Sequence, residues 1–541
     1  MTLHIAGNPV PLWILFASTA GIGILLNICI YRLFFHPYAK YPGPFLAKLT
    51  SWYSVYHTYY GDLHLDIWEC HQKYAIYSQG KNTQKVKAYR KVSLVSGVHP
   101  TFSMIDNQGH AKLRRLVGQG LSDSHVRAYD QELRQSALLF ATRLGEKLDR
   151  FEPSRVDDIA DGWTAPKNLS SWANYFSFDV MSYLVYGTSY DLLTKSEDHW
   201  VIDGVLGQMR RISFLTMLPE LEDMRFDRLL FPDARRKAYQ FSAKSRQIME
   251  ARRDKEKHIQ AEDQEIKVDL FSKLLAAKDP ETGEGLSDRQ LWAESNLMII
   301  AGENRTSFTN STQPNCLAFN NPGIPSVGSD TSSTGIASTF FYLSRHPSAY
   351  ARVTNEVRST ITSPEDICQG PKLNSCKYLR ACILESMRLS PPAGGAMWRQ
   401  VVPGGMQIGN SNHDTHVPGG CEIGTGIFAI HHNQEHYPDP FKFWPERWLS
   451  DEVGEENVAK AHAAFNAFSQ GPRSCPGKSL AMIEISFALA AVMMSYDFRK
   501  VESRLGEVGE GKGKFAGQYQ TFWAFTSLKD GPYIQFKPIK S

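Results

Sequence analysis

The sequence predicts a mainly α (α+β) protein, in which a helix-rich body with minor β-sheets follows a single transmembrane helix. The 541 residues are 42% hydrophobic and 12% aromatic, which is enough apolar material for a large core and excludes disorder as the main state. Apolar residues recur at helical spacing through 126–148, 236–257 and 479–494, so helices dominate the body. An uncharged stretch at 12–31 predicts the membrane helix.

The anchor segment 12–31 is long enough to cross a bilayer, because about 20 helical residues at about 1.5 Å each span the ~30 Å hydrocarbon layer. A cleaved signal peptide is the alternative, since residues 18–20 resemble a small-residue cleavage site, but the apolar sequence continues to Ile30. Positive charge begins only at Arg32, so the positive-inside rule predicts a luminal segment 1–11 and a cytosolic body.

Beyond the anchor, the Pro/Gly-rich residues 32–50 predict a stiff elbow, because proline cannot continue a helix. Residues 51–541 are expected to form one catalytic domain that rests on membrane lipid. Strands are expected near 405–424 and at the carboxyl-terminal end, where Gly531 and Pro532 separate two apolar runs as a hairpin turn does.

Composition excludes several classes of protein. The formal net charge of +3 gives no reason to expect nucleic acid as a partner. The eight cysteines include no C-x-x-C pair, so most are expected to be reduced and buried. Motifs of serine hydrolases, P-loop proteins and zinc proteases are absent from the sequence, as is any flavin or nicotinamide domain. His431, His432 and His436 are interpreted as a polar loop, because no cysteine or carboxylate completes a metal-ligand set.

The most informative stretch is 468–477, a loop that carries Cys475 immediately before a helical run. Backbone N–H groups and the positive end of the helix dipole favour a thiolate at this position, and a thiolate can ligate iron. Gly471 permits a tight turn and Gly477 permits close backbone approach.

The spacing Phe-x-x-Gly-x-Arg-x-Cys-x-Gly resembles the haem-binding signature of the cytochrome P-450 superfamily of haem-thiolate monooxygenases. All five fixed residues are present, at Phe468, Gly471, Arg473, Cys475 and Gly477. The resemblance implies the cytochrome P-450 fold and heme b (iron protoporphyrin IX), with Cys475 as its axial thiolate and metal ligand. It assigns Phe468, Arg473 and Gly477 to cofactor binding as well, with Arg473 facing a haem propionate and Phe468 shielding the sulfur.

A second match is Glu385-x-x-Arg388, whose spacing places a carboxylate and a guanidinium on one helix face. Such pairs are common on surfaces, where each contributes well under about 1 kcal/mol. Here Pro445-Glu-Arg447-Trp lies downstream and resembles the family segment whose arginine joins this pair. The resemblance implies a buried structural network of Glu385, Arg388 and Arg447.

Upstream, His110 and Arg114 lie one helical turn apart and can reach one anionic partner together, although a solvated basic helix gives the same pattern. The resemblance implies that both contact a haem propionate, as does Arg399 after the Pro391-Pro392 turn.

Asp330 and Thr331 resemble the acid and alcohol pair of the family's distal helix, although a Ser/Thr-rich helix cap is the common alternative. The resemblance implies that Thr331 hydrogen-bonds bound oxygen and that Asp330 relays protons, so these two are the expected catalytic residues. Residues 303–328 interrupt this helix, with prolines that cannot continue it. We interpret 303–328 as a non-native insert, a translated intron.

A second departure follows Ala75, where relatives continue into a strand pair that this chain lacks, so an edge of the amino-terminal sheet is expected to be exposed. The segments Tyr41-Pro-Gly-Pro44 and His431-His-Asn433 are most similar to fungal membrane-bound members of secondary metabolism.

The resemblance therefore predicts a monooxygenase that inserts one oxygen atom from O2 into an apolar small molecule. Electrons are expected from a separate NADPH-cytochrome P-450 reductase, and the location is expected to be the endoplasmic reticulum membrane, single-pass. Expected substrate contacts are 102–104, 392–397 and 525–526. The alternatives are a reductase-independent dehydratase or isomerase, and a non-catalytic membrane protein inactivated by the insert.

Overall fold

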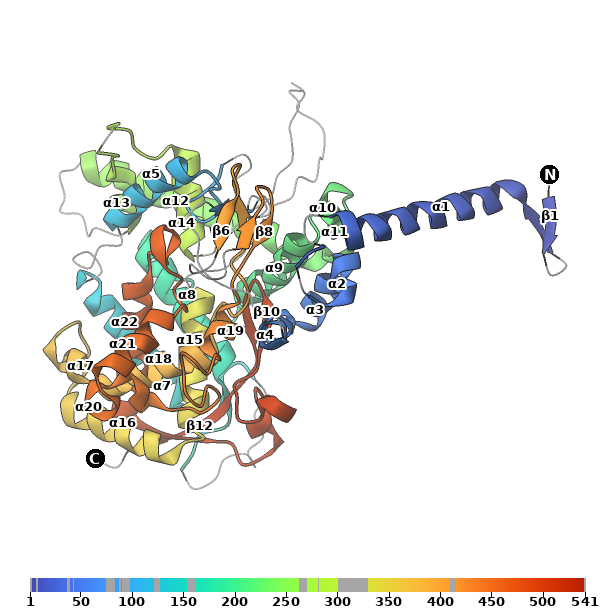
Figure 1. The fold of residues 1–541 in the computed structure, drawn as a ribbon. Coiled ribbons are helices and arrows are strands. Elements are labelled where there is room, and N and C mark those ends of the chain that lie inside the picture. The colour runs from blue at the N-terminus through green and yellow to red at the C-terminus, as the bar shows by residue number, and fades with distance from the viewer. Residues whose placement is uncertain are drawn as a thin grey trace.

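The computed structural model describes most of the chain, and its helix-rich body carries one long helix that projects from it (Figure 1). The described residues are 2–5, 8–36, 39–41, 43–73, 83–86, 89, 98–120, 127–152, 162–261, 270–280, 282–299, 329–408 and 415–539. The suspected insert 303–328 and the expected gap after Ala75 both lie outside them.

The projecting helix is α1, Leu12–Ile30, which continues through one π-helical turn, Tyr31–Phe35. Its large apolar side chains are exposed, among them Trp13 and Phe16. Length and composition make Leu12–Phe35 a candidate membrane span. This agrees with the predicted anchor at 12–31. It is preceded by a short antiparallel hairpin of β1, Thr2–Ile5, and β2, Asn8–Pro11.

The remaining helices make up most of the body. The helices of its amino-terminal half are α2 (Phe45–Leu49), α3 (Trp52–Tyr60), α4 (Leu63–Lys73), α5 (Asn107–Gly120), α7 (Asp130–Leu144), α8 (Leu169–Tyr186), α9 (Trp200–Met217), α10 (Glu220–Asp223), α11 (Asp227–Leu230), α12 (Pro232–Ala261), α13 (Leu270–Ala276) and α14 (Asp288–Ile299). Those that follow are α15 (Ser329–Leu343), α16 (Pro347–Thr360), α17 (Pro371–Ser375), α18 (Lys377–Leu389), α19 (Ile427–His431), α20 (Ser450–Val453), α21 (Glu455–Ala464) and α22 (Lys478–Ser495).

The core forms where α15 packs against α8, α18 and α22. Every residue of α15 is buried except Thr331, so this helix runs through the centre of the body. Gly335 allows α15 to approach α22 closely, because a Cβ there would lie 2.7 Å from Cδ1 of Ile485. The predicted helices at 126–148, 236–257 and 479–494 are confirmed as α7, α12 and α22.

The strands form small sheets. They are β3 (Thr83–Lys85), β4 (Lys167–Asn168), β5 (Arg399–Val401), β6 (Met406–Ile408), β7 (Thr415–Val417), β8 (Glu422–Ile423), β9 (Tyr496–Lys500), β10 (Thr521–Ala524), β11 (Thr526–Lys529) and β12 (Tyr533–Pro538). The described pairings are β3-β5-β8, β4-β12-β9, β6-β7 and β10-β11, all antiparallel. A mainly helical body with minor sheets is therefore confirmed.

Two local predictions were wrong. The hairpin turn lies at Phe525, where φ is 73°, and not at Gly531-Pro532. The Gly-Pro pair is instead the corner at which the chain leaves β11 and joins a different sheet as β12, because β12 pairs with β9. His431 and His432 do not form a polar loop either: both are buried, at the end of α19 and immediately after it. No metal-binding group of histidine, cysteine and acidic residues occurs among the described residues.

Candidate functional site

Cys475 lies in the loop that leads into α22. Its backbone N–H donates to the carbonyl of Phe468 at 2.8 Å, which folds the loop back on itself. Gly471 has φ of 72°, a conformation that favours glycine, and begins the short 3-10 turn Gly471–Arg473. Gly477 caps the start of α22, and a Cβ there would lie 3.9 Å from the Cys475 sulfur. The loop therefore brings the helix start and the sulfur together.

Burial raises the pKa of the Cys475 thiol, while the Gly477 backbone N–H and the positive charges of Arg114 and Lys478 oppose that rise. The net direction is upward, so the loop by itself does not yield a free thiolate at neutral pH. A metal ion bound to the sulfur would remove the proton. The sequence argument from the helix dipole was therefore incomplete, because it left out the cost of burying the charge.

Arg473 joins this loop to the segment before α5. Its guanidinium donates to the carbonyls of Met104 at 2.8 Å and Ile105 at 3.0 Å, and to Asn107 Oδ1 at 2.8 Å. Burial lowers the pKa of Arg473 to about 10, with Arg399 adding to this and Asp106 opposing it. The protein itself thus satisfies part of the hydrogen-bonding capacity of this guanidinium.

Positive charge accumulates beside the Cys475 loop. Arg114 of α5 donates to the Ser474 carbonyl at 2.6 Å and to its hydroxyl at 3.2 Å. The basic side chains that interact electrostatically here are Lys85, His110, Arg114, Arg399 and Arg473. Burial, together with the charges of the four other basic side chains, lowers the pKa of His110 to about 3.

Such a cluster repels itself, because like charges that are partly withdrawn from water disfavour one another. Lys85 illustrates the cost: burial, Arg399 and Arg473 together hold its pKa well below its ordinary value. An anionic group placed among these side chains would relieve the repulsion. The residues present therefore fit a cofactor that carries carboxylates next to a metal held by Cys475, as haem does.

Glu385, Arg388 and Arg447 are fully or almost fully buried and hydrogen-bonded to one another. Glu385 accepts two bonds of 2.9 Å from Arg388 and one of 3.0 Å from Arg447 Nε. Trp448 Nε1 and the Trp444 backbone N–H each add a bond of 3.0 Å. Burial alone would raise the pKa of Glu385, but the two arginines hold it below its ordinary value.

The arginines in turn fix the neighbouring chain. Arg388 donates to the carbonyls of His431 and Pro440, each at 2.7 Å, and Arg447 donates twice to the Pro438 carbonyl at 3.1 Å. The network thereby joins α18 to the segment that precedes the Cys475 loop.

Asp330 and Thr331 lie in the first turn of α15. Thr331 is the one residue of this helix that is not fully buried, and its burial is intermediate. Asp330 is buried and its Oδ1 lies 2.9 Å from Lys529 Nζ. The two residues therefore differ in environment, as a partly exposed alcohol beside a buried acid.

The segments expected to contact substrate meet in an apolar cluster. Phe102 and Phe525 lie with ring centroids 5.8 Å apart, and Tyr89 lies within 5.9 Å of both. The hydroxyl of Tyr89 approaches the Met397 sulfur at 3.7 Å. Ile212 of α9 packs in the same cluster. Segments 102–104, 392–397 and 525–526 are thus neighbours in space although they are distant in sequence.

Sequence reasoning missed three buried ionisable residues near these groups: Lys85, Glu484 and Lys529. Lys85 of β3 donates to the Phe102 carbonyl and lies 3.7 Å from the Phe102 ring centroid. Burial raises the pKa of Glu484 to about 8, against the opposing effect of the Ser177 and Ser332 hydroxyls that face it. None of the three belongs to a spaced motif, although a charge in an apolar helix such as α22 is itself a signal.

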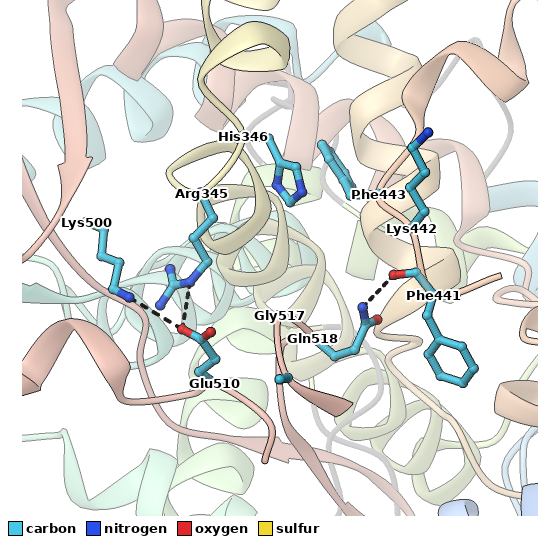
Figure 2. Close-up of a pocket in the computed structure, with 10 residues that line it drawn as sticks. Arg345, His346, Phe441, Lys442, Phe443, Lys500, Glu510, Gly517 and Gln518 are labelled. Atoms are coloured by element: carbon cyan, nitrogen blue, oxygen red, sulfur yellow. Dashed lines mark hydrogen bonds and ion pairs between the residues drawn. The ribbon is translucent and has the colours of Figure 1, made fainter. Parts of the chain in front are cut away.

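A surface cleft of about 310 Å³ lies away from these residues, at the opposite end of α15 (Figure 2). Figure 2 shows Glu510 between Arg345 and Lys500, at 3.2 Å and 3.4 Å. Arg345 also donates to the Gly506 carbonyl at 2.6 Å. Two cations of this cleft, Arg345 and Lys500, already pair with Glu510, and we do not assign the cleft a ligand.

Comparison with known proteins matches the chain to a family. The family described as Cytochrome P450 matches residues 111–312 and 326–508, which is more than half of the chain. The match is interrupted at 313–325, inside the suspected insert.

Three similar relatives are fungal. Cytochrome P450 monooxygenase apf7 of Gibberella fujikuroi is 70% identical over 98% of this chain and 98% of the relative. Cytochrome P450 monooxygenase AKT7 of Alternaria alternata is 36% identical over 95% of this chain and 96% of the relative. Cytochrome P450 monooxygenase atnE of Emericella nidulans is 35% identical over 97% of this chain and 96% of the relative. The chain therefore belongs to the cytochrome P450 family of haem-thiolate monooxygenases.

Proposed function

We propose that this enzyme binds heme b through Cys475 and oxidises an apolar small molecule of fungal secondary metabolism, with electrons from a separate NADPH-cytochrome P-450 reductase. The observation that carries the proposal is that the Cys475 thiol lies beside a cluster of mutually repelling cations. One cofactor with an iron and two carboxylates would bind the thiol through its iron and relieve the repulsion through its carboxylates. When bound, that cofactor supplies the activation of O2 and the transfer of one oxygen atom.

Each residue of the cofactor site has a proposed role. Cys475 would hold the cofactor's iron through its sulfur, and Phe468 and Gly477 would shield and orient that sulfur through the folded loop. Arg114, Arg399, Arg473 and His110 bind the cofactor's carboxylates. Because burial and the surrounding cations lower the pKa of His110 to about 3, it is neutral in the absence of an anion and acts as a hydrogen-bond donor rather than as a charge.

Proton handling is assigned to Thr331 and Asp330. Thr331 is the half-buried residue in the first turn of α15, and its hydroxyl would hold a proton for the oxygen chemistry that the cofactor would supply. Asp330 lies beside it in the same turn and passes protons inward from solvent. The buried α15 excludes water elsewhere along its length, so that protons enter at one end of the helix.

The substrate class is proposed from the apolar cluster in which the expected contact segments meet. Phe102, Tyr89, Phe525 and Ile212 supply rings and an aliphatic chain there, with Lys85 as the charged group beside the Phe102 ring, so the cluster favours an apolar small molecule. Glu385, Arg388 and Arg447 act structurally, since all three are buried and satisfied by one another and by carbonyls.

For the membrane, we propose a single-pass arrangement in the endoplasmic reticulum. Residues 1–11 are luminal, 12–31 span the bilayer and contact lipid, 32–50 form the elbow, and 51–541 form the cytosolic catalytic domain. The exposed apolar surface of α1 and the first positive charge at Arg32 support this orientation.

We propose further that 303–328 is foreign to the mature enzyme. The interruption of the family match at 313–325 supports this. The alignment with apf7 is 552 positions long, which exceeds the 541 residues of this chain. Some of its positions are therefore filled in apf7 and empty in this chain, which supports a missing segment. Sequencing of the mature transcript tests both proposals, and an intact message that encodes 303–328 would refute the first.

The function is tested with purified chain, as given and without 303–328, reconstituted with a fungal NADPH-cytochrome P-450 reductase. A pyridine haemochrome spectrum should identify heme b. With isotopically labelled O2 and a panel of apolar terpenoid, polyketide and fatty-acid probes, one labelled oxygen should enter a product only when NADPH and reductase are present. Product formed without reductase would favour a dehydratase or isomerase. Absence of haem from both forms would favour a non-catalytic membrane protein.

A further inference from the structure

A buried lysine lies against the first turn of α15. Lys529 is the last residue of β11, and its side chain is 1% exposed, while that of Asp330 is 3% exposed. Lysine is seldom buried to this extent unless its charge is paired, because removing an ammonium group from water is costly. Here the ammonium nitrogen lies 2.9 Å from Asp330 Oδ1.

The remaining hydrogen-bonding capacity of the ammonium is also used. It lies 3.2 Å from Asn174 Oδ1 on α8 and 3.4 Å from the Asp330 carbonyl. Ser333 donates to Asn174 Oδ1 at 2.5 Å, so the same amide oxygen receives bonds from two directions. Three elements, α8, α15 and β11, thus meet at Lys529, and its three N–H groups each have a partner.

The hairpin that carries Lys529 also reaches the apolar cluster of Phe102, Tyr89 and Phe525. Its turn residue Phe525 packs against Phe102 and Tyr89. Between these two points, Ser527 donates to Pro391 and Pro392, through its hydroxyl at 2.8 Å and its backbone N–H at 2.9 Å. One hairpin therefore contacts the apolar cluster at its turn and Asp330 at its end.

We propose that Lys529 is a positioning residue that holds Asp330 as an ionised carboxylate turned toward the β10–β11 hairpin. The proposal rests on the proposed function of Asp330 in proton delivery. To pass a proton, Asp330 must leave the ammonium or take up a proton beside it, so the ion pair sets how readily the acid acts.

Other ionisable groups face this end of α15, and the test must distinguish them from Asp330. Glu484 of α22 faces Ser332, the residue after Thr331. Burial raises the pKa of Tyr519 well above its ordinary value, and the charge of Asp330 adds to this shift. A test must therefore identify Asp330 itself, which a variant of this residue allows.

The test is infrared difference spectroscopy of the resting full-length protein in H2O and D2O, which needs no turnover. Lys529→Met leaves a buried carboxylate without its counter-charge, so Asp330 should take up a proton and one new carboxylic-acid C=O band per chain should appear. That band should be missing from the Lys529→Met/Asp330→Asn double variant. Lys529→Arg, which keeps the charge, should produce no acid band.

The matched control is Lys500→Met, which removes a partly exposed lysine whose Nζ lies 3.4 Å from Glu510 and should leave the acid region unchanged. An unchanged spectrum in Lys529→Met would overturn the proposal. If Lys529→Met does not fold, Asp330→Asn alone decides: loss of a carboxylate band supports the proposal, and loss of an acid band contradicts it. These bands do not depend on oxygen insertion, so failure of the proposed monooxygenase reaction would be seen separately, as absence of labelled product.

Discussion

Replacement of Glu385 by glutamine tests the network that supports the cofactor side of the core. The side chain is fully buried and accepts five hydrogen bonds, three at Oε1 and two at Oε2. A glutamine keeps the shape of the side chain but carries N–H donors in place of one of the two carboxylate oxygens. It therefore loses two or three of the bonds and leaves two arginines without a counter-charge.

The expected loss of unfolding free energy is about 3–5 kcal/mol, which is the cost of removing one partner from a buried ion pair. Since the pKa of Glu385 is held below its ordinary value in the folded protein, its stabilising effect is present at neutral pH. The effect is lost as the pH falls through the range in which the carboxyl protonates. The two perturbations, acid pH and the glutamine substitution, should therefore not be additive.

The assay is urea unfolding of the full chain in detergent, followed by tryptophan fluorescence. The matched control is Glu502→Gln, because Glu502 also pairs with an arginine at i,i+3 spacing, at 3.2 Å, but is 82% exposed. That change should cost less than about 1 kcal/mol. If Glu385→Gln costs no more than Glu502→Gln, the reasoning about burial is wrong.

Three other substitutions test the cofactor site and the packing around it. Arg399→Gln should weaken haem retention about 10-fold or more without lowering the stability of the haem-free chain, because it removes one of several mutually repelling cations. Equilibrium haem titration and urea unfolding check this. A destabilised apoprotein would contradict it. Burial raises the pKa of Glu484 from its ordinary 4.5 to about 8, so between these pH values the folded state holds a proton that the unfolded state has released. The free energy of unfolding should therefore fall by up to about 1.4 kcal/mol per pH unit as the pH rises through this window. Glu484→Gln should flatten this slope in urea midpoints, and an equal slope would refute it. Gly395→Ala should lower the free energy of unfolding by about 1–3 kcal/mol, because its Cβ would lie 2.0 Å from Trp523 Nε1. The control Gly118→Ala, whose Cβ meets nothing within 4 Å, should not destabilise the chain. Equal unfolding midpoints for the two variants would exclude the clash.

Much of the fold and the site was predictable because its residues are close together in sequence. The Cys475 loop is one continuous segment, and its spacing carries both the turn and the helix start. Glu385 and Arg388 are one helical turn apart, so helical geometry alone brings them together. The anchor was equally predictable, since an uncharged apolar segment of this length is typical of a membrane-spanning helix.

What could not be predicted depends on contacts between distant segments. Lys529 meets Asp330 across 199 residues of chain, and no spacing rule links a strand end to a helix start. Lys85 is similar, since its burial beneath Phe102 requires the sheet to be assembled first. The error at Gly531-Pro532 has another cause: a Gly-Pro pair marks a change of direction but does not say which strand the chain pairs with next.

The most direct test of the account is the carbon monoxide difference spectrum of the reduced protein, recorded for the parent chain, for Cys475→Ser and for Cys368→Ser. Cys368 is a free, partly buried cysteine outside the loop and serves as the control. We predict a thiolate-type Soret band in the parent and in Cys368→Ser and its loss in Cys475→Ser. A thiolate-type band that survives in Cys475→Ser would contradict the assignment of Cys475 as the iron ligand.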